Sequence, residues 1–249
     1  AFRSHYGRTN VGEVVLGFVG DDLGNVPSPW GNCRDILLED FGADFEIVSG
    51  AASGGIAVVI KMSRYLFSGF RNLGLDVWSI SSSVLKKIKV AIQEGTLLVN
   101  DAYSPKHVHP ERRYHALIET PKHTFIGARD VMCDYHPIYA LRDAIRQARR
   151  MNDPFVQSVV IVCEDFGGGA PQVMYKDRQH LLELNLQAEL LAGKENDPPG
   201  FLANYDAQHQ VTGVWETSVK EWIPFAFIPS NFGQEFVEHL TKYFQGLKR

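Results

Sequence analysis

Runs of apolar residues between turn-forming residues predict strands along much of the chain. The strongest run is Val156 to Cys163, and Gly55 to Lys61 has the continuous apolar pattern of a strand that is buried on both faces. The other expected strands are Gly12 to Gly20, Thr96 to Asn100, Arg113 to Glu119, Val211 to Val219 and Trp222 to Ile228.

Apolar residues three or four positions apart predict helices between these strands. One helix begins after the serines at 81–83, which supply an N-cap, and is expected to end at Gly95. A second covers Pro137 to Met151, with the proline in its first turn and arginines near its C-terminus. Two more are expected from about Arg178 to Ala192 and, with one apolar face, over 231–249.

The helices do not alternate regularly with the strands, so a doubly wound parallel sheet is not expected. The pattern favours a mainly β protein, with antiparallel sheets that carry helices on their outside. We expect a single domain over 1–249: an extended arm over 1–11, a β core with inserted helices over 12–230 and a C-terminal amphipathic helix over 231–249. From the residues alone, the arm is as free to fold back on its own domain as to reach a neighbouring chain.

The composition is that of an ordinary globular protein, with 45% apolar and 22% charged residues in a chain of 249. A net charge of −4 argues against a protein that binds nucleic acid over its whole surface. No apolar run is long enough for a membrane span, and the N-terminus lacks the apolar core of a signal peptide. We therefore expect neither nucleic acid nor a membrane as a partner.

The histidines His107, His109 and His115 are the candidate metal ligands. His107 and His109 share one face of an extended segment near Glu111, an arrangement that suits Zn²⁺ in a metal-dependent hydrolase. No HExxH spacing is present, and the prolines around this pair indicate a surface loop. Solvated histidines are the favoured interpretation, so we expect no metal and no other cofactor.

Cysteines and glycines offer two weaker signals. Cys33, Cys133 and Cys163 lack metal-ligand spacing and cannot all pair within one chain, which leaves a free thiol or a bridge to another chain. A glycine run follows a predicted strand, as in phosphate-binding loops, but lacks their further motif residues. We interpret it as a structural turn formed by Gly167, Gly168, Gly169 and Pro171.

Four segments carry a resemblance when they are taken together. They are the N-terminal stretch with Phe2, Arg3, Tyr6, Gly7, Arg8 and Thr9; the Leu97 to Asn100 stretch with the following Arg113-Tyr114; the Gly167 to Pro171 turn; and Val211 to Trp222. Each resembles a segment of the baculovirus polyhedrin and granulin family, and all four occur in the family's order. The chain is similar to a distant member of that family, such as one from a nudivirus.

The resemblance implies a structural protein, not an enzyme, that self-assembles into the crystalline matrix of viral occlusion bodies. Such a matrix forms in the host cell nucleus, embeds and protects virions, is released to the environment and dissolves in the alkaline gut of the larva. The implied fold is an antiparallel β-sandwich of the jelly-roll type with peripheral helices and extended arms. The implied partners are other copies of the chain, assembled through trimers, and the embedded virions.

Two departures from the family pattern affect these expectations. The basic nuclear-targeting run is missing, and the lysines at 86, 87 and 89 are a poor substitute for it. Arg113 and Ala170 stand where the family has cysteines. A disulfide between copies of the chain would therefore use Cys33, Cys133 or Cys163.

Dissolution in alkali would act through groups that titrate above neutral pH. The chain holds 9 Tyr, which become negative in alkali, and its lysines lose their charge there, whereas its arginines do not titrate. From their positions in predicted loops and turns, the candidate switch residues are Tyr6, Tyr103, Tyr114, Tyr135, Tyr139, Lys106, Lys122 and Lys220.

Overall fold

A computed structural model describes residues 16–20, 33–34, 37, 46–51, 58–61, 80–98, 113–129, 139–164, 170–171, 173–223 and 234–246. The chain divides into two compact units. The first comprises Ala1–Ser68, Met174–Gln179 and Ile223–Arg249, and the second Gly69–Val173 and His180–Trp222. The predicted arm over 1–11 lies outside the described residues, and the prediction of a single domain stays a prediction.

The first unit contains a small mixed sheet and a helix. Strands β1 (Leu16–Gly20), β2 (Glu46–Ala51) and β3 (Val58–Lys61) follow in that order, with β1 parallel and β3 antiparallel to β2. The expected C-terminal helix is confirmed as α7 (Gln234–Gly246), and none of its residues is buried.

The second unit is built on a five-stranded mixed sheet. Its strands are β4 (Tyr114–Glu119), β5 (Thr124–Ala128), β6 (Ser158–Glu164), β7 (Pro199–Tyr205) and β8 (Val211–Ser218), in the spatial order β5-β4-β6-β7-β8. Strands β6 and β7 are parallel, and the other neighbouring pairs are antiparallel. The helices α4 (Ser82–Leu98), α5 (Ala140–Arg150) and α6 (Tyr175–Ala192) flank this sheet.

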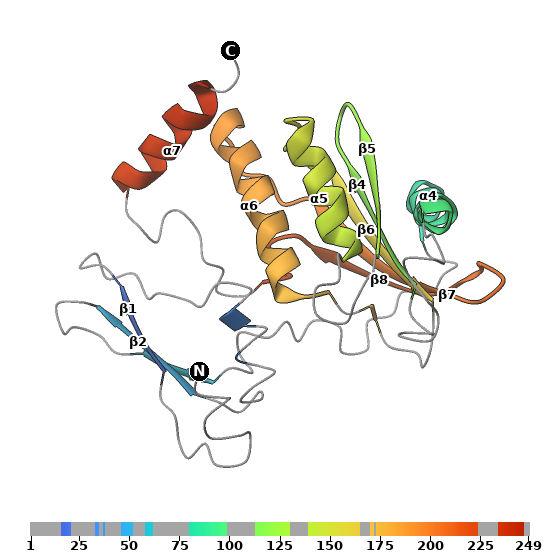
Figure 1. The fold of residues 1–249 in the computed structure, drawn as a ribbon, viewed down its shortest axis with the longest axis horizontal. Helices are drawn as coiled ribbons and strands as arrows, with labels where there is room; N and C mark the ends of the chain where they lie inside the picture. Colours follow the sequence, from blue (N-terminus) through green and yellow to red (C-terminus); the bar gives the residue numbers. More distant parts are fainter. Residues whose placement is uncertain are drawn as a thin grey trace. The chain divides into compact units, whose positions relative to one another are not determined.

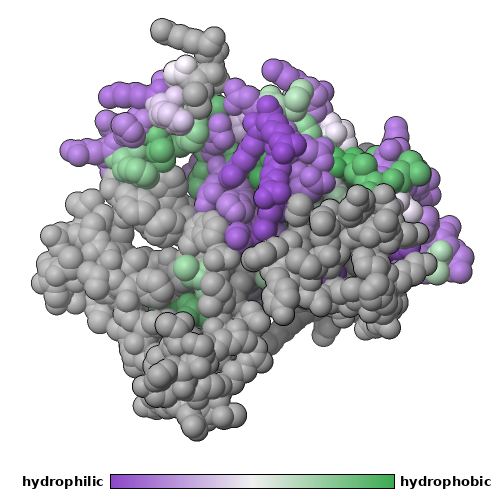
Figure 2. Space-filling model, in the orientation of Figure 1, coloured by the Kyte–Doolittle hydropathy of each residue, from purple (hydrophilic) through white to green (hydrophobic). Residues whose placement is uncertain are grey.

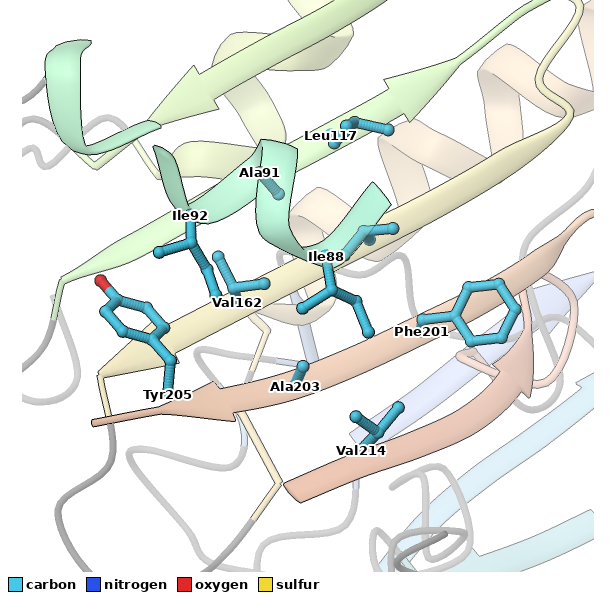
Figure 3. Packing of buried hydrophobic residues seen from close by; sticks show 10 residues of the cluster. Ile88, Ala91, Ile92, Leu117, Val162, Phe201, Ala203, Tyr205 and Val214 are labelled. Carbon is cyan, nitrogen blue, oxygen red and sulfur yellow. The ribbon is translucent and has the colours of Figure 1, made fainter. Parts of the chain in front are cut away.

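Helix α4 lies on one side of the sheet, opposite the side that α5 and α6 cover (Figure 1). Apolar side chains of α4 pack on alternate residues of the central strands, as the two-residue period of a strand requires. Figure 3 shows this layer, in which Ile88 and Ile92 point down toward Val162 and Ala203. Its buried members are Ile88, Ala91, Ile92, Leu117, Val160, Val162, Phe201, Ala203, Tyr205 and Val214.

Helix α5 approaches strand β5 closely because the residues at their contact have small side chains or none. Its buried face includes Ala140, Ala144 and Ala148. On β5, Gly127 has no side chain, and a Cβ there would come within 2.1 Å of the Ala140 carbonyl oxygen. The backbone of the strand therefore rests directly on the backbone of the helix.

The expected fold class, a mainly β jelly-roll sandwich of antiparallel sheets, is wrong. The five-stranded sheet has helices on both faces and contains the parallel pair β6 and β7, so the unit is of the α/β class. The parallel pair follows from the chain order, because a helix that connects two neighbouring strands brings the second back in the same direction. The strands expected from the sequence did not include Pro199–Tyr205, which forms β7.

The segment Thr96 to Asn100 was also assigned wrongly in part. Thr96 to Leu98 are the last residues of α4, which continues past the expected stop at Gly95. The strands around Arg113 to Glu119 and Val156 to Cys163, and the helices that include residues 140–150 and 178–192, are confirmed with small shifts of their ends.

Candidate functional site

A buried polar pair lies beneath the C-terminal half of α4. The side chains of His115 on β4 and Tyr205 on β7 are 0% and 1% exposed. His115 Nε2 and Tyr205 Oη share a hydrogen bond of 3.1 Å across β6, and the two rings stack with centroids 6.2 Å apart. Gly95 lets α4 pass over the imidazole, since a Cβ there would lie 2.4 Å from His115 Cγ.

The environment of this pair keeps both groups neutral. Burial, then the positive charge of Arg113 and the proximity of His209, lower the pKa of His115 to about 4. Burial, then the carboxylate of Glu164 and the thiol of Cys163, raise the pKa of Tyr205 against a smaller opposing effect of Arg113. His115 Nδ1 has no hydrogen-bond partner among the described residues. Of the two ring nitrogens of His115, only Nε2 therefore has a hydrogen-bond partner among the described residues.

A second polar cluster joins α4 to the other end of the sheet. Lys87 Nζ forms an ion pair with Glu119 Oε2 and donates a hydrogen bond of 3.0 Å to Ser158 Oγ, which donates in turn to Glu119 at 2.8 Å. Burial of Glu119 opposes its ionisation, but the hydrogen bonds from Lys87 and Ser158 outweigh it, so its pKa is lowered. The cluster holds a charged lysine over the sheet.

A third cluster fixes the turn between β4 and β5. Asp153 Oδ2 accepts a hydrogen bond of 2.6 Å from Thr120 Oγ1 and lies 2.7 Å from His123 Nδ1. Asp153 and Thr120 are both buried, whereas His123 is partly exposed. Because the carboxylate follows α5 directly, these bonds tie the hairpin to the end of that helix.

We expect Asp153→Ala to lower the free energy of unfolding by about 2 to 3 kcal/mol, because it removes the buried carboxylate that both the Thr120 hydroxyl and His123 Nδ1 contact. Urea unfolding followed by circular dichroism measures the change. The matched control is Asp206→Ala at the β7–β8 turn, where the carboxylate accepts from exposed backbone amides of Gln208 and Gln210. A loss for Asp153→Ala no larger than that for the control would contradict the assignment.

Lys220, an expected alkaline switch residue, is paired within its own chain. Its Nζ lies 2.9 Å from Glu189 Oε1 and 3.7 Å from Glu195 Oε2. Burial alone would lower its pKa, but the hydrogen bond to Glu189 and the charges of Glu189, Glu195 and Asp197 raise it. Lys220 therefore keeps its charge to higher pH than an ordinary lysine.

Three other expected switch residues lie in the described part of the chain, and two of them, Tyr114 and Tyr139, contact arginines. The Arg129 guanidinium lies 5.9 Å from the ring centroid of Tyr114 and 5.7 Å from that of Tyr139. Arg142 lies on the same Tyr139 ring at 5.7 Å. Both tyrosines are thus engaged in cation–π contacts within the chain. Lys122 is exposed at the β4–β5 turn.

The remaining expected residues are only partly described. Cys163 is buried and its thiol donates a hydrogen bond of 3.3 Å to the Glu164 carbonyl, Cys33 is exposed, and Pro171 is buried. His115, expected among the candidate metal ligands, is the residue paired with Tyr205. The other expected site residues lie outside the described part of the chain: Phe2, Arg3, Tyr6, Gly7, Arg8, Thr9, Tyr103, Lys106, His107, His109, Cys133, Tyr135, Gly167, Gly168 and Gly169.

Neither a metal cluster nor a large ligand pocket stands out in the described ranges. No group of three or more His, Cys, Asp or Glu residues there is arranged to hold a metal ion, and no described helix is long and apolar enough to cross a membrane. A hollow beside the β4–β5 turn, lined by Phe155, Gln157 and Asn196 among others, has a volume of about 180 Å³. That is less than the usual volume of a pocket for a drug-sized ligand.

Tyr205, Glu119 and Asp153 were not among the site residues expected from the sequence. Strand alternation offers one signal, since it places His115 on the same face as Leu117 and so predicts a buried imidazole. The partner of that imidazole is 90 residues away in sequence. No local pattern connects the two.

Comparisons with known proteins leave the family of this chain open. No protein-family model and no curated protein matches it. Among solved structures, it is similar to a cytidine deaminase from Burkholderia pseudomallei, with 20% identity and a TM-score of 0.41, over 59% of this chain and 100% of that one. The matched protein is an enzyme, in contrast to the expectation that this chain is not one. A likeness of this degree assigns no reaction to the chain.

Proposed function

We propose that this chain is a structural protein that self-assembles into the crystalline matrix of viral occlusion bodies, embeds virions and dissolves in alkali. The observation that carries the proposal is the shared order of four segments that resemble polyhedrin and granulin, from the N-terminal stretch to Val211–Trp222. Two properties of the described residues support it. They are the contacts sensitive to alkali and the apolar side chains at the surface.

Alkali would act on the chain both through its net charge and through its internal contacts. Reference pKa values take the net charge from −4 at pH 7 to roughly −20 near pH 10.5, as lysines, tyrosines and cysteines lose protons. Repulsion between neighbours in a lattice rises with that charge. The ion pair of Lys87 and Glu119 is one of the contacts between α4 and the sheet, and it depends on the positive charge of the lysine.

Large apolar side chains stand at the surface of the described residues. Leu97 and Leu98 at the end of α4 are 80% and 54% exposed, and Tyr243 on α7 is 57% exposed. Green atoms mark apolar surface near both helices (Figure 2). Helix α7 has 13 residues and no buried one, and a helix of that length is only marginally stable without packing. A neighbouring copy of the chain would supply packing for such surfaces.

Expression in insect cells tests the proposal. We expect refractile crystals in the nucleus that persist at pH 7 and whose turbidity clears above about pH 10, where lysine and tyrosine titrate. A parallel series with a reducing agent separates any contribution of disulfides between chains from that of charge. A chain that stays soluble and monomeric at high concentration would overturn the proposal.

A further inference from the structure

The hollow beside the β4–β5 turn lies within the second unit and has a largely apolar lining. Three segments that are distant in sequence form it: the turn after β4, the stretch before β6 and the C-terminal end of α6. Its volume of about 180 Å³ is close to the roughly 150 Å³ of apolar cavities that hold one benzene ring. The apolar residues of the lining are Pro121, Phe155, Val156, Ala188 and Ala192.

Asn196 adds a polar side chain to this lining, and its orientation is fixed. Its Nδ2 donates hydrogen bonds of 3.0 Å to the Val156 carbonyl and to Asn185 Oδ1. Its backbone amide donates to Glu189 Oε1 at 2.8 Å, and its carbonyl accepts from the buried Asn185 at 2.8 Å. Because Nδ2 faces two oxygen atoms, turning the amide group over would lose both of its bonds.

Two polar groups at the hollow have no partner among the described residues. None of these residues donates a hydrogen bond to Asn196 Oδ1, and none forms an ion pair with the exposed Lys194. The carboxylate of Glu195, which follows Lys194 in sequence, lies 3.7 Å from the ammonium of Lys220 instead. Ligand sites commonly combine an apolar surface with a few polar groups that orient the ligand, and the hollow has this combination.

We propose that this hollow binds a monocyclic aromatic acid that carries a hydroxyl group. The ring would lie against the apolar lining, where contact with the ring of Phe155 adds to the burial of apolar surface. The carboxylate would pair with Lys194, and the hydroxyl would donate to Asn196 Oδ1. Because the acceptor is already held in place, binding does not have to order it.

Size and charge both narrow the class of ligand. The volume matches one ring, and Lys194 is the one cationic residue of the lining, so a single negative charge on the ligand balances it. This site goes beyond the proposed self-assembly, because all of its lining residues belong to one unit of one chain and no second copy is needed.

A titration of the full chain with three related probes tests the proposal. The probes are 4-hydroxybenzoate, benzoate, which lacks the hydroxyl, and phenol, which lacks the carboxylate, and the backbone amide signals of residues 188–196 are followed by NMR. We expect 4-hydroxybenzoate to bind with a dissociation constant on the order of 1 mM, as for a small ligand in an open site. Benzoate and phenol should each bind about threefold or more weakly, because each lacks one polar contact.

Two variants locate the binding in the hollow. Ala192→Trp places a large side chain at an exposed position of the lining and is expected to weaken binding of 4-hydroxybenzoate at least about tenfold. Ala207→Trp, at an exposed position of the β7–β8 turn, is the matched control and should leave the binding unchanged. Lys194→Gln should weaken binding of 4-hydroxybenzoate but not of phenol.

Three results would overturn the proposal. They are no saturable shift of these amide signals with any probe up to about 10 mM, binding of phenol as tight as that of 4-hydroxybenzoate, and equal binding by Ala192→Trp and Ala207→Trp. The formation of crystals in insect cells is measured separately, so failure of the ligand site and failure of the proposed function are distinguishable.

Discussion

Gly127→Ala is expected to prevent the second unit from folding, or to lower its free energy of unfolding by more than about 3 kcal/mol. The added methyl group would lie 2.1 Å from the Ala140 carbonyl oxygen and 2.7 Å from the Ala144 amide nitrogen. Both are backbone atoms of α5, so no side chain can rotate away, and the whole helix must move off β5. Urea unfolding and the yield of soluble protein measure the effect.

The matched control is the same substitution at Gly246, where an added Cβ meets nothing within 4 Å. Alanine has the higher helix propensity, so Gly246→Ala is expected to change stability by less than about 1 kcal/mol, in the favourable direction if at all. A change in the free energy of unfolding for Gly127→Ala as small as that for the control would contradict the close packing of α5 on β5.

Glycines explain where the sequence predicted the fold and where it did not. Gly95 was interpreted as a helix stop, yet it lies inside α4. A glycine is needed there because the ring of His115 occupies the space that a side chain would fill. Gly200, which follows two prolines, was not expected in a strand. It belongs to β7 and leaves room for the Trp222 ring, which a Cβ would meet at 2.6 Å. Sequence patterns treat glycine as a chain breaker, whereas these two positions serve packing between distant segments.

The fold class was predicted wrongly because strand β7 was not expected. Pro199 occupies the first position of the strand, where a missing amide is tolerated, and the residues after it pair with the central strand β6. With β7 in place, α6 becomes a connection between parallel strands. The long apolar run of β6 and the periodic helices were predictable because their signals are local. The order of the strands depends on contacts that no local pattern contains.

The same limit applies to the candidate site. Lys220 was singled out as a group that alkali would neutralise, but its partner Glu189 lies on α6 and raises its pKa. His115 was grouped with its neighbours in sequence, and the fold pairs it with Tyr205 instead. Residue type and spacing identified titratable groups, and the surroundings that set their behaviour came from the tertiary structure.

The His115 and Tyr205 pair is expected to limit stability at both ends of the pH range. His115 titrates at about 4 in the folded chain against 6.5 in the reference, so its contribution is present above pH 6.5 and is lost as the pH falls toward 4. The full loss is on the order of 3 kcal/mol. The pKa of Tyr205 is raised above 10.0, so its contribution is present below pH 10 and is lost as the pH rises further.

Tyr205→Phe separates this effect from general alkaline repulsion. At pH 8 the variant is expected to be less stable by about 1 to 2 kcal/mol, because His115 Nε2 loses its partner. Between about pH 9 and 11 it should lose less further stability than the original chain, since Phe has no proton to release. Tyr243→Phe, at an exposed position on α7, is the matched control and should leave the pH profile unchanged. Equal alkaline losses in the original chain and in Tyr205→Phe would show that the buried phenol does not set the limit.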